Sequence, residues 1–414
     1  MKRTLLMLAG CGVVWTQLAL PVRAAEPVVS VRAEVTAAAR PNAAVIYWIA
    51  FSALPTITQE QREMMTAAAK TTLEPIPKDV RATLTQYEIA LHEMHRAVQC
   101  EACDWQLDYA AGPHLLLPHL QHARDLAWAG LVRARVRFAA GENEAALNDV
   151  LAVLRMGRDC GRSPVIISML VDVAVERLAI EMLAAHLSQL TPDQLSQLPQ
   201  RLQALPQTAT AAEGFRKESD MFGGWVGRRI EEEGAKLNDP KAGARILGVI
   251  QKEDLLGDDL TTGIDAEAKR RRELVQSLTL EELRSAVHRL QADYDELAKI
   301  VELPFAERGP KFAAFQAGLD QSRKLACRDD LVRYLSVQFI PSYKQVSLRM
   351  DELHVRRALL DLVIQVQLHG PEVLKSAPIQ GAIVEYHQTD ADFELRYQIP
   401  GADKAETLKV PAKK

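Results

Sequence analysis

The chain has 414 residues, and its 50 lysines and arginines against 54 aspartates and glutamates give a formal net charge of −4. This balance lacks the basic surplus of a nucleic-acid-binding face, so nucleic acid is not an expected partner. Aromatic residues make up only 5%, and Ala and Leu dominate, which favours packed helices over sheets. The length fits two or three domains.

The N-terminus has the three-part pattern of a secretory signal. Lys2 and Arg3 precede a mostly apolar, uncharged stretch over residues 4–20, and small residues follow. Cleavage after Ala24 or Ala25 is expected, which predicts a periplasmic or secreted protein.

An alternative reading of the same segment stays open. The run Leu8-Ala9-Gly10-Cys11 resembles a bacterial lipobox, in which Cys11 would be lipidated. The protein would then be a membrane-tethered lipoprotein, and this tether is the only membrane contact that the sequence predicts.

Four cysteines follow the expected cleavage site: Cys100, Cys103, Cys160 and Cys327. An even number of cysteines in an oxidising compartment suits one or two disulfides. The sequence leaves the pairing open.

Helical patterns recur to about residue 370. Three capping boxes, in which a threonine is followed three residues later by Gln or Glu, predict helix starts at Thr58, Thr191 and Thr279. Two sets of apolar residues with helical spacing each lie on one stripe. The first comprises Val80, Leu84, Tyr87, Leu91, Met94 and Val98, and the second Leu280, Leu283, Val287, Leu290, Tyr294, Leu297 and Val301. The second stripe could form a coiled-coil seam, but a long helix packed on its neighbour is preferred, because the pattern lasts only about three heptads.

Residues 120–160 read as a helical hairpin. Gly141 suits the tight turn, and Ala146 suits a close helix approach, as in a tetratricopeptide repeat. Ser163 is the expected cap of the next helix, whose body over residues 165–187 is apolar almost all round. This predicts a central buried helix, and its charged residues argue against a membrane span. They are Asp172, Glu176, Arg177 and Glu181.

The C-terminal segment changes period. Gly370-Pro371 ends the last long helix, and apolar residues then alternate with polar ones over residues 393–399, as in a half-buried strand. Residues 382–387 are the expected partner strand, and the Lys-rich end is expected to fray.

The predicted fold class is therefore mainly α, with antiparallel helix hairpins in a repeat-like array and a small C-terminal β-hairpin. The expected divisions are a signal peptide (1–25), an N-terminal helical domain (26–205), a C-terminal helical domain (206–370), and a hairpin with its tail (371–414).

One constellation offers metal chemistry. His92, His95, Cys100 and Cys103 supply two imidazoles and two sulfurs, a reasonable tetrahedral zinc set. Oxidation of the cysteines to a disulfide would remove the thiolates that bind metal. No other cofactor is expected.

Further candidates carry less chemistry. His119 and His122 read as a helix-start pair whose rings bind backbone or water. Glu213 and Glu218 are a conceivable cleft edge for acid–base chemistry, although an amphipathic face explains them as well. The sequence contains no Gly-x-Ser-x-Gly elbow, no phosphate-binding glycine loop and no dinucleotide fingerprint.

Five segments occur in an order that resembles a family of exported helical proteins, common in planctomycete-type bacteria. They are Cys103-Asp104-Trp105, Leu117-Pro118-His119-Leu120, residues 154–158, residues 165–171, and residues 357–370. The family usually continues after His369-Gly370 with Tyr-Pro and an Asp-Pro-Phe-type loop, and this chain lacks both. The resemblance implies a helical fold and export, and no particular activity.

The leading functional hypothesis is a non-enzymatic binding or scaffold protein of the cell envelope, which holds a protein or envelope partner in a helical groove. It rests partly on fold. Two alternatives stay open: a metal-binding or redox protein that uses His92, His95, Cys100 and Cys103, and a hydrolase with dispersed carboxylates.

Overall fold

In the computed structural model, residues Pro41–Lys414 form one compact unit. The structure describes residues 41–163, 165–237, 239, 242–252, 266–324, 343–376, 379, 384–389, 392–399 and 404–411. The expected signal peptide, Cys11 and Cys327 lie outside the described residues.

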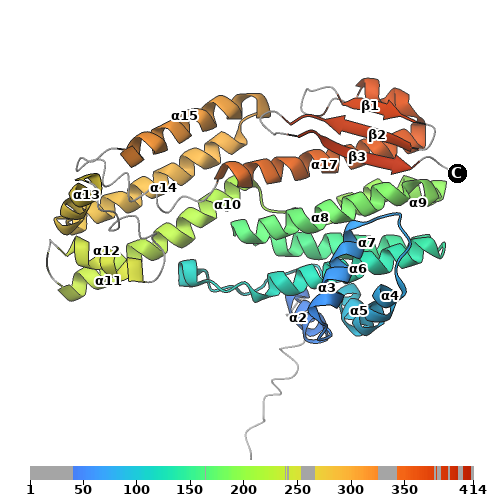
Figure 1. Cartoon of the computed structure of the whole chain (residues 1–414), viewed down its shortest axis with the longest axis horizontal. Coiled ribbons are helices and arrows are strands. Elements are labelled where there is room, and N and C mark those ends of the chain that lie inside the picture. The colour runs from blue at the N-terminus through green and yellow to red at the C-terminus, as the bar shows by residue number, and fades with distance from the viewer. Residues whose placement is uncertain are drawn as a thin grey trace, which may run out of the picture. The chain divides into compact units, whose positions relative to one another are not determined.

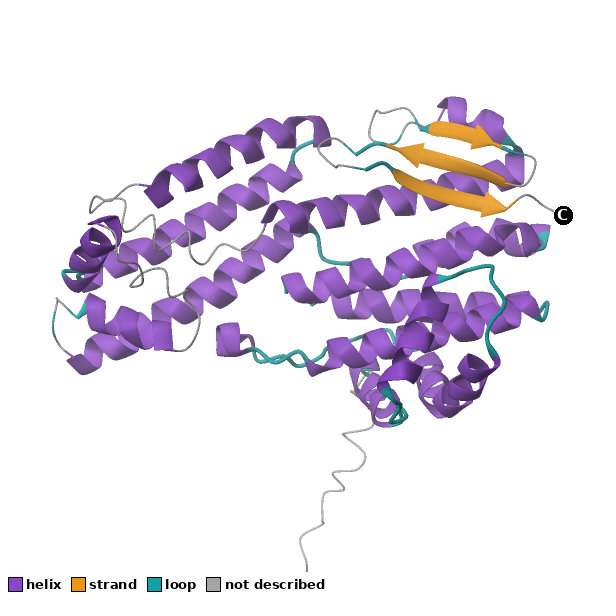
Figure 2. Cartoon of the chain, viewed as in Figure 1, coloured by secondary structure: helices purple, strands orange, loops and turns teal. Residues whose placement is uncertain are grey.

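The protein is mainly helical and carries a small antiparallel sheet near its C-terminus, which confirms the predicted fold class (Figures 1 and 2). The helices are α2 (Ala43–Ser52), α3 (Gln59–Lys70), α4 (Lys78–Leu84), α5 (Glu88–Ala97), α6 (Pro118–Ala139), α7 (Asn143–Gly161), α8 (Ile166–His186), α9 (Pro192–Gln203), α10 (Ala211–Glu218), α11 (Gly224–Leu237), α12 (Gly243–Lys252), α13 (Ala266–Gln276), α14 (Leu280–Glu302), α15 (Phe305–Lys324) and α17 (Tyr343–His369). The strands are β1 (Glu385–Gln388), β2 (Asp392–Tyr397) and β3 (Glu406–Pro411).

The three predicted capping boxes are confirmed. The hydroxyls of Thr58, Thr191 and Thr279 accept from the third backbone N–H of α3, α9 and α14, and each return bond is also present. A fourth box, Thr210 with Glu213, opens α10. Each box satisfies backbone donors that a helix start would otherwise leave unpaired.

The first predicted stripe is buried except for Val98, which is partly buried, and it spans two helices. A short 3₁₀ segment, Thr85–Tyr87, separates α4 from α5. The second stripe forms the buried face of α14, with Leu280 only partly buried.

The helical hairpin of α6 and α7 is confirmed. Gly141 adopts a φ of 78° in the turn, a conformation that favours glycine, and Ala146 is fully buried where the two helices approach. Helices α6, α7 and α8 lie side by side, and α17 packs beside α8 (Figure 1).

The expected serine cap of α8 is wrong. The helix begins at Ile166 with Val165 as its N-cap, and the Ser163 hydroxyl lies 2.9 Å from the Tyr109 hydroxyl. The backbone N–H of Ile166 instead donates to Glu218 Oε1 at 3.1 Å. A carboxylate from the end of α10 thus replaces the local cap, which local sequence could not reveal.

Glu176 of α8 forms buried ion pairs. Glu176 is fully buried and accepts from Arg158 Nε at 2.7 Å and from Arg357 Nε and Nη2 at 2.8 and 2.6 Å. The contact joins α7, α8 and α17 across the division expected at residue 206. None of the described helices is long and apolar enough to cross a membrane.

The C-terminal sheet has three strands in the order β1-β2-β3, all antiparallel (Figure 2). The predicted hairpin is confirmed as β1 and β2, but the expectation of a frayed end is wrong for residues 406–411, which form β3. Leu408 and Val410 are buried there on both sides of the exposed Lys409. Arg356 of α17 binds Glu406 of β3 and joins the sheet to the helices.

We expect Arg357→Ala to lower the free energy of unfolding by about 3 kcal/mol, because it leaves a fully buried carboxylate with one arginine fewer. Arg349→Ala is the matched control, since Arg349 forms only an exposed pair with Glu352 and its loss is worth about 0.5 kcal/mol. Urea denaturation measures both. Equal effects of the two changes would contradict the structural role of Arg357.

Candidate functional site

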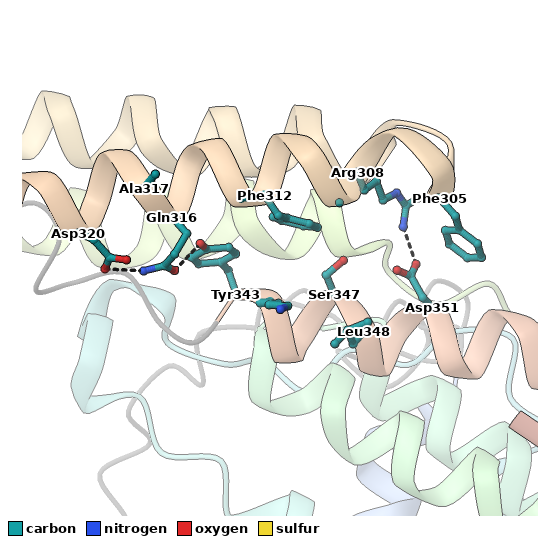
Figure 3. Close-up of a pocket in the computed structure, with 13 residues that line it drawn as sticks. Phe305, Arg308, Phe312, Gln316, Ala317, Asp320, Tyr343, Ser347, Leu348 and Asp351 are labelled. Carbon is teal, nitrogen blue, oxygen red and sulfur yellow. Dashed lines mark hydrogen bonds and ion pairs between the residues drawn. The ribbon is translucent and has the colours of Figure 1, made fainter. Parts of the chain in front are cut away.

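A pocket of about 420 Å³ lies between α15 and α17. Its α15 wall consists of residues at helical spacing, and the small side chains of Gly309, Ala313 and Ala317 leave the space open. Phe312 and Tyr343 stack with ring centroids 5.6 Å apart beside it (Figure 3). The middle of the pocket is therefore mostly apolar.

Each end of this pocket carries hydrogen-bonding groups (Figure 3). At one end, Arg308 Nη1 binds Asp351 Oδ1 at 2.5 Å, and the Arg308 guanidinium lies 4.8 Å from the Phe305 ring centroid. At the other end, the Tyr343 hydroxyl donates to Gln316 Oε1 at 2.7 Å, and Gln316 Nε2 donates to an Asp320 carboxylate.

Two more pockets continue along α17. The second pocket, of about 430 Å³, shares Phe305, Arg308 and Asp351 with the first. The third pocket, of about 190 Å³, shares Gln207 and Arg357 with the second. We call the three together the α17 groove. Its α17 wall includes a row of residues on one helix face: Tyr343, Ser347, Asp351, His354, Arg357 and Asp361. At 1.5 Å per residue, this wall is about 27 Å long.

Several charged side chains of the groove occur as ion pairs. Arg308 faces Asp351, Arg357 faces Glu176, and Glu302 binds Arg216 at 2.8 Å. Burial raises the pKa of Asp351, although Arg308 beside it acts in the opposite direction. The second and third pockets are thus more polar than the first, although apolar side chains also line them, and they are nearly balanced in charge.

The four expected zinc ligands do not come together. His92 is exposed, and His95 Nε2 lies 2.7 Å from Asp149 Oδ1 on α7. The Cys100 sulfur lies 4.0 Å from the carbonyl oxygen of Arg96, and Cys103 lies in the loop that follows. In the parts of the chain that the structure describes, no three His, Cys, Asp or Glu side chains are grouped as metal ligands. The zinc hypothesis gains no support and stays a prediction.

Asp149, the partner of His95, is a structural anchor. It is fully buried and also accepts from Arg133 Nη2 at 2.6 Å and Arg137 Nη1 at 2.7 Å. The position of His95 is thus explained by the packing of α5 on α6 and α7.

The expected carboxylate cleft has structural explanations too. Glu213 closes the capping box of α10, and Glu218 caps α8, where burial raises its pKa. The two acids do not face a common pocket among those found in the described residues. The hydrolase hypothesis stays a prediction without a site.

His119 lies in an aromatic cluster at the start of α6. Its ring stacks on Trp105 at a centroid distance of 4.4 Å and meets the Trp48 ring edge-on at 6.4 Å. Both ring nitrogens are buried, and neither has a hydrogen-bond partner among the described residues. The backbone partner expected for the His119 ring is therefore absent among the described residues. Burial lowers the pKa of His119 to about 4.

The α17 groove was not predicted from the sequence. A signal was present, because Gly309, Ala313 and Ala317 repeat at intervals of four in a segment that also contains three phenylalanines. Small residues at this spacing also occur where helices pack closely, so the pattern alone does not separate a groove from a contact.

No family model, curated protein or solved structure matches this chain. The resemblance stated from the five segments stays a prediction.

Folding stability should depend on His119 below neutral pH. The folded-state pKa of about 4 lies below the ordinary value of 6.5, so the unfolded chain takes up this proton first as the pH falls. We expect His119→Phe, which keeps the ring stack, to gain stability relative to the parent protein, by about 3 kcal/mol more at pH 4 than at pH 7. Urea titrations of both proteins across this range measure the difference. A difference that does not change with pH would contradict the burial of a neutral imidazole.

Proposed function

We propose that this protein is a non-enzymatic binding protein that holds a single elongated amphiphile in the α17 groove. The observation that carries the proposal is the order of the three pockets, since a mostly apolar pocket continues along α17 into two pockets with a larger share of polar groups. This order matches a ligand with an apolar tail and a hydrogen-bonding head. The pocket volumes fall in or near the range of small-molecule sites.

The tail would occupy the first pocket. Phe305, Phe312 and Leu348 supply apolar surface there, while Gly309, Ala313 and Ala317 supply the space. Burial of each methylene group contributes about 0.8 kcal/mol. Affinity for a tail should therefore come from its length.

The head would occupy the second and third pockets. Thr208, Thr210 and His354 line the second pocket with groups that form hydrogen bonds. Because the second and third pockets each contain as many acids as arginines, a charged head would lose hydration without a net counter-charge to replace it. An uncharged or zwitterionic head, such as an alcohol, amide or phosphocholine-type group, fits this balance best.

The first test is a series of linear alcohols from hexanol to dodecanol, with binding to the full chain measured by calorimetry. We expect each added methylene to tighten binding about fourfold until the first pocket is full. Alkanoates and alkylammonium ions of equal length should bind more weakly. Affinity that does not change with chain length would contradict a tail site.

The second test fills the first pocket. We expect Ala313→Trp to weaken binding of the best alcohol at least tenfold, because the indole takes the space of the tail. Ala314→Trp is the matched control, since Ala314 is exposed on α15 outside the pocket lining. Both variants should unfold near the parent midpoint. Equal binding by the two variants would place the tail elsewhere.

A further inference from the structure

The loop that contains Cys103 is fixed on the last turns of α7. Arg155 Nη2 of α7 donates to the carbonyl oxygen of Cys100 at 2.8 Å, and Trp105 Nε1 donates to the carbonyl oxygen of Asp159 at 2.9 Å. These bonds hold the backbone on both sides of Cys103 against the part of α7 that ends with Cys160.

A second set of bonds holds the loop from the side of α2. The backbone N–H of Ala43 donates to the carbonyl oxygen of Ala102 at 2.8 Å. The Asn42 side chain donates to the carbonyl oxygen of Asp104 at 2.7 Å and accepts from the Asp104 backbone N–H at 2.8 Å. The immediate neighbours of Cys103 are thus both tied to one helix start, which leaves the loop little freedom.

The two sulfurs share one buried environment. Cys160 is fully buried, and Cys103 is partly buried against the same core. The Tyr47 phenol donates to Asp159 Oδ2 at 3.0 Å. Burial raises the pKa of Tyr47, and the charges of Asp159, Cys103 and Cys160 raise it further, which places both cysteines near this phenol. Beyond burial, Cys103 raises the pKa of the Cys160 thiol more than Asp172 or Asp159 does.

We propose that Cys103 and Cys160 form a disulfide, with Cys103 as the accessible partner and Cys100 left as a thiol. The structure contains Cys100, Cys103 and Cys160 as free thiols, which is the reduced state. The Cys100 sulfur lies against the last turn of α5, 4.0 Å from the Arg96 carbonyl oxygen, and so belongs to a different contact.

The chemistry is thiol–disulfide exchange with a small disulfide such as oxidised glutathione. The Cys103 thiolate attacks one glutathione sulfur and releases one reduced glutathione. The Cys160 thiolate then attacks the Cys103 sulfur of the mixed disulfide and releases the second. Two protein thiols are oxidised, and one glutathione disulfide is reduced to two thiols. Because burial raises the pKa of both thiols, the exchange should be slow in the folded protein and fast during folding.

The test refolds the full chain from urea in a buffer of reduced and oxidised glutathione, blocks the remaining thiols by alkylation, and maps the peptides by mass spectrometry without reduction. We expect one major linked pair, Cys103 with Cys160, and an alkylated Cys100. A major link that involves Cys100 or Cys327, or alkylation of both Cys103 and Cys160, would overturn the proposal.

Three variants separate the link from a packing effect. The parent protein and Cys100→Ser should each gain several degrees in melting temperature on oxidation, because the link closes a loop of nearly sixty residues in the unfolded chain. Cys103→Ser and Cys160→Ser should lose this gain and the linked peptide. If Cys160→Ser fails to fold, Cys103→Ser at the partly buried position still gives the readout. A gain that persists in Cys103→Ser would overturn the assignment.

Discussion

Glu176 is the carboxylate on which the arrangement of the central helices depends. It is fully buried in α8 and is bound by Arg158 of α7 and by two nitrogens of Arg357 of α17. Burial of a charge without partners is strongly unfavourable, so the acid stabilises only the packing that brings both arginines to it. The same contact sets the position of α17, and α17 forms one wall of the groove.

A second acid of α8, Asp172, explains two glycines of α7, Gly157 and Gly161. Asp172 lies one helical turn earlier than Glu176, and burial and the neighbouring Glu176 raise its pKa well above its ordinary value. A methyl group on Gly161 would lie 2.7 Å from Asp172 Oδ2, and one on Gly157 would lie 3.1 Å from Oδ1. Glycines on α7 therefore make room for the buried side chain of Asp172 on α8.

The sequence predicted what depends on near neighbours. The capping boxes, the turn at Gly141 and the end of α17 at Gly370 each involve residues a few positions apart, and all are present. Contacts between distant residues were not predictable in this way. Glu218 caps a helix that begins 52 residues earlier, and Arg357 binds an acid 181 residues away. The groove was missed for the same reason, since its second wall lies on another helix.

The segments behind the family resemblance have packing roles in this structure. Trp105 stacks on His119, Arg158 binds Glu176, and so does Arg357 from the last segment. Buried polar contacts of this kind restrict which residues a position accepts, because a lost partner leaves an unpaired group. A resemblance carried by such positions is therefore informative about fold. Function would depend instead on the open wall of α15, where Ala313 and Ala317 fix only the space that a ligand could occupy.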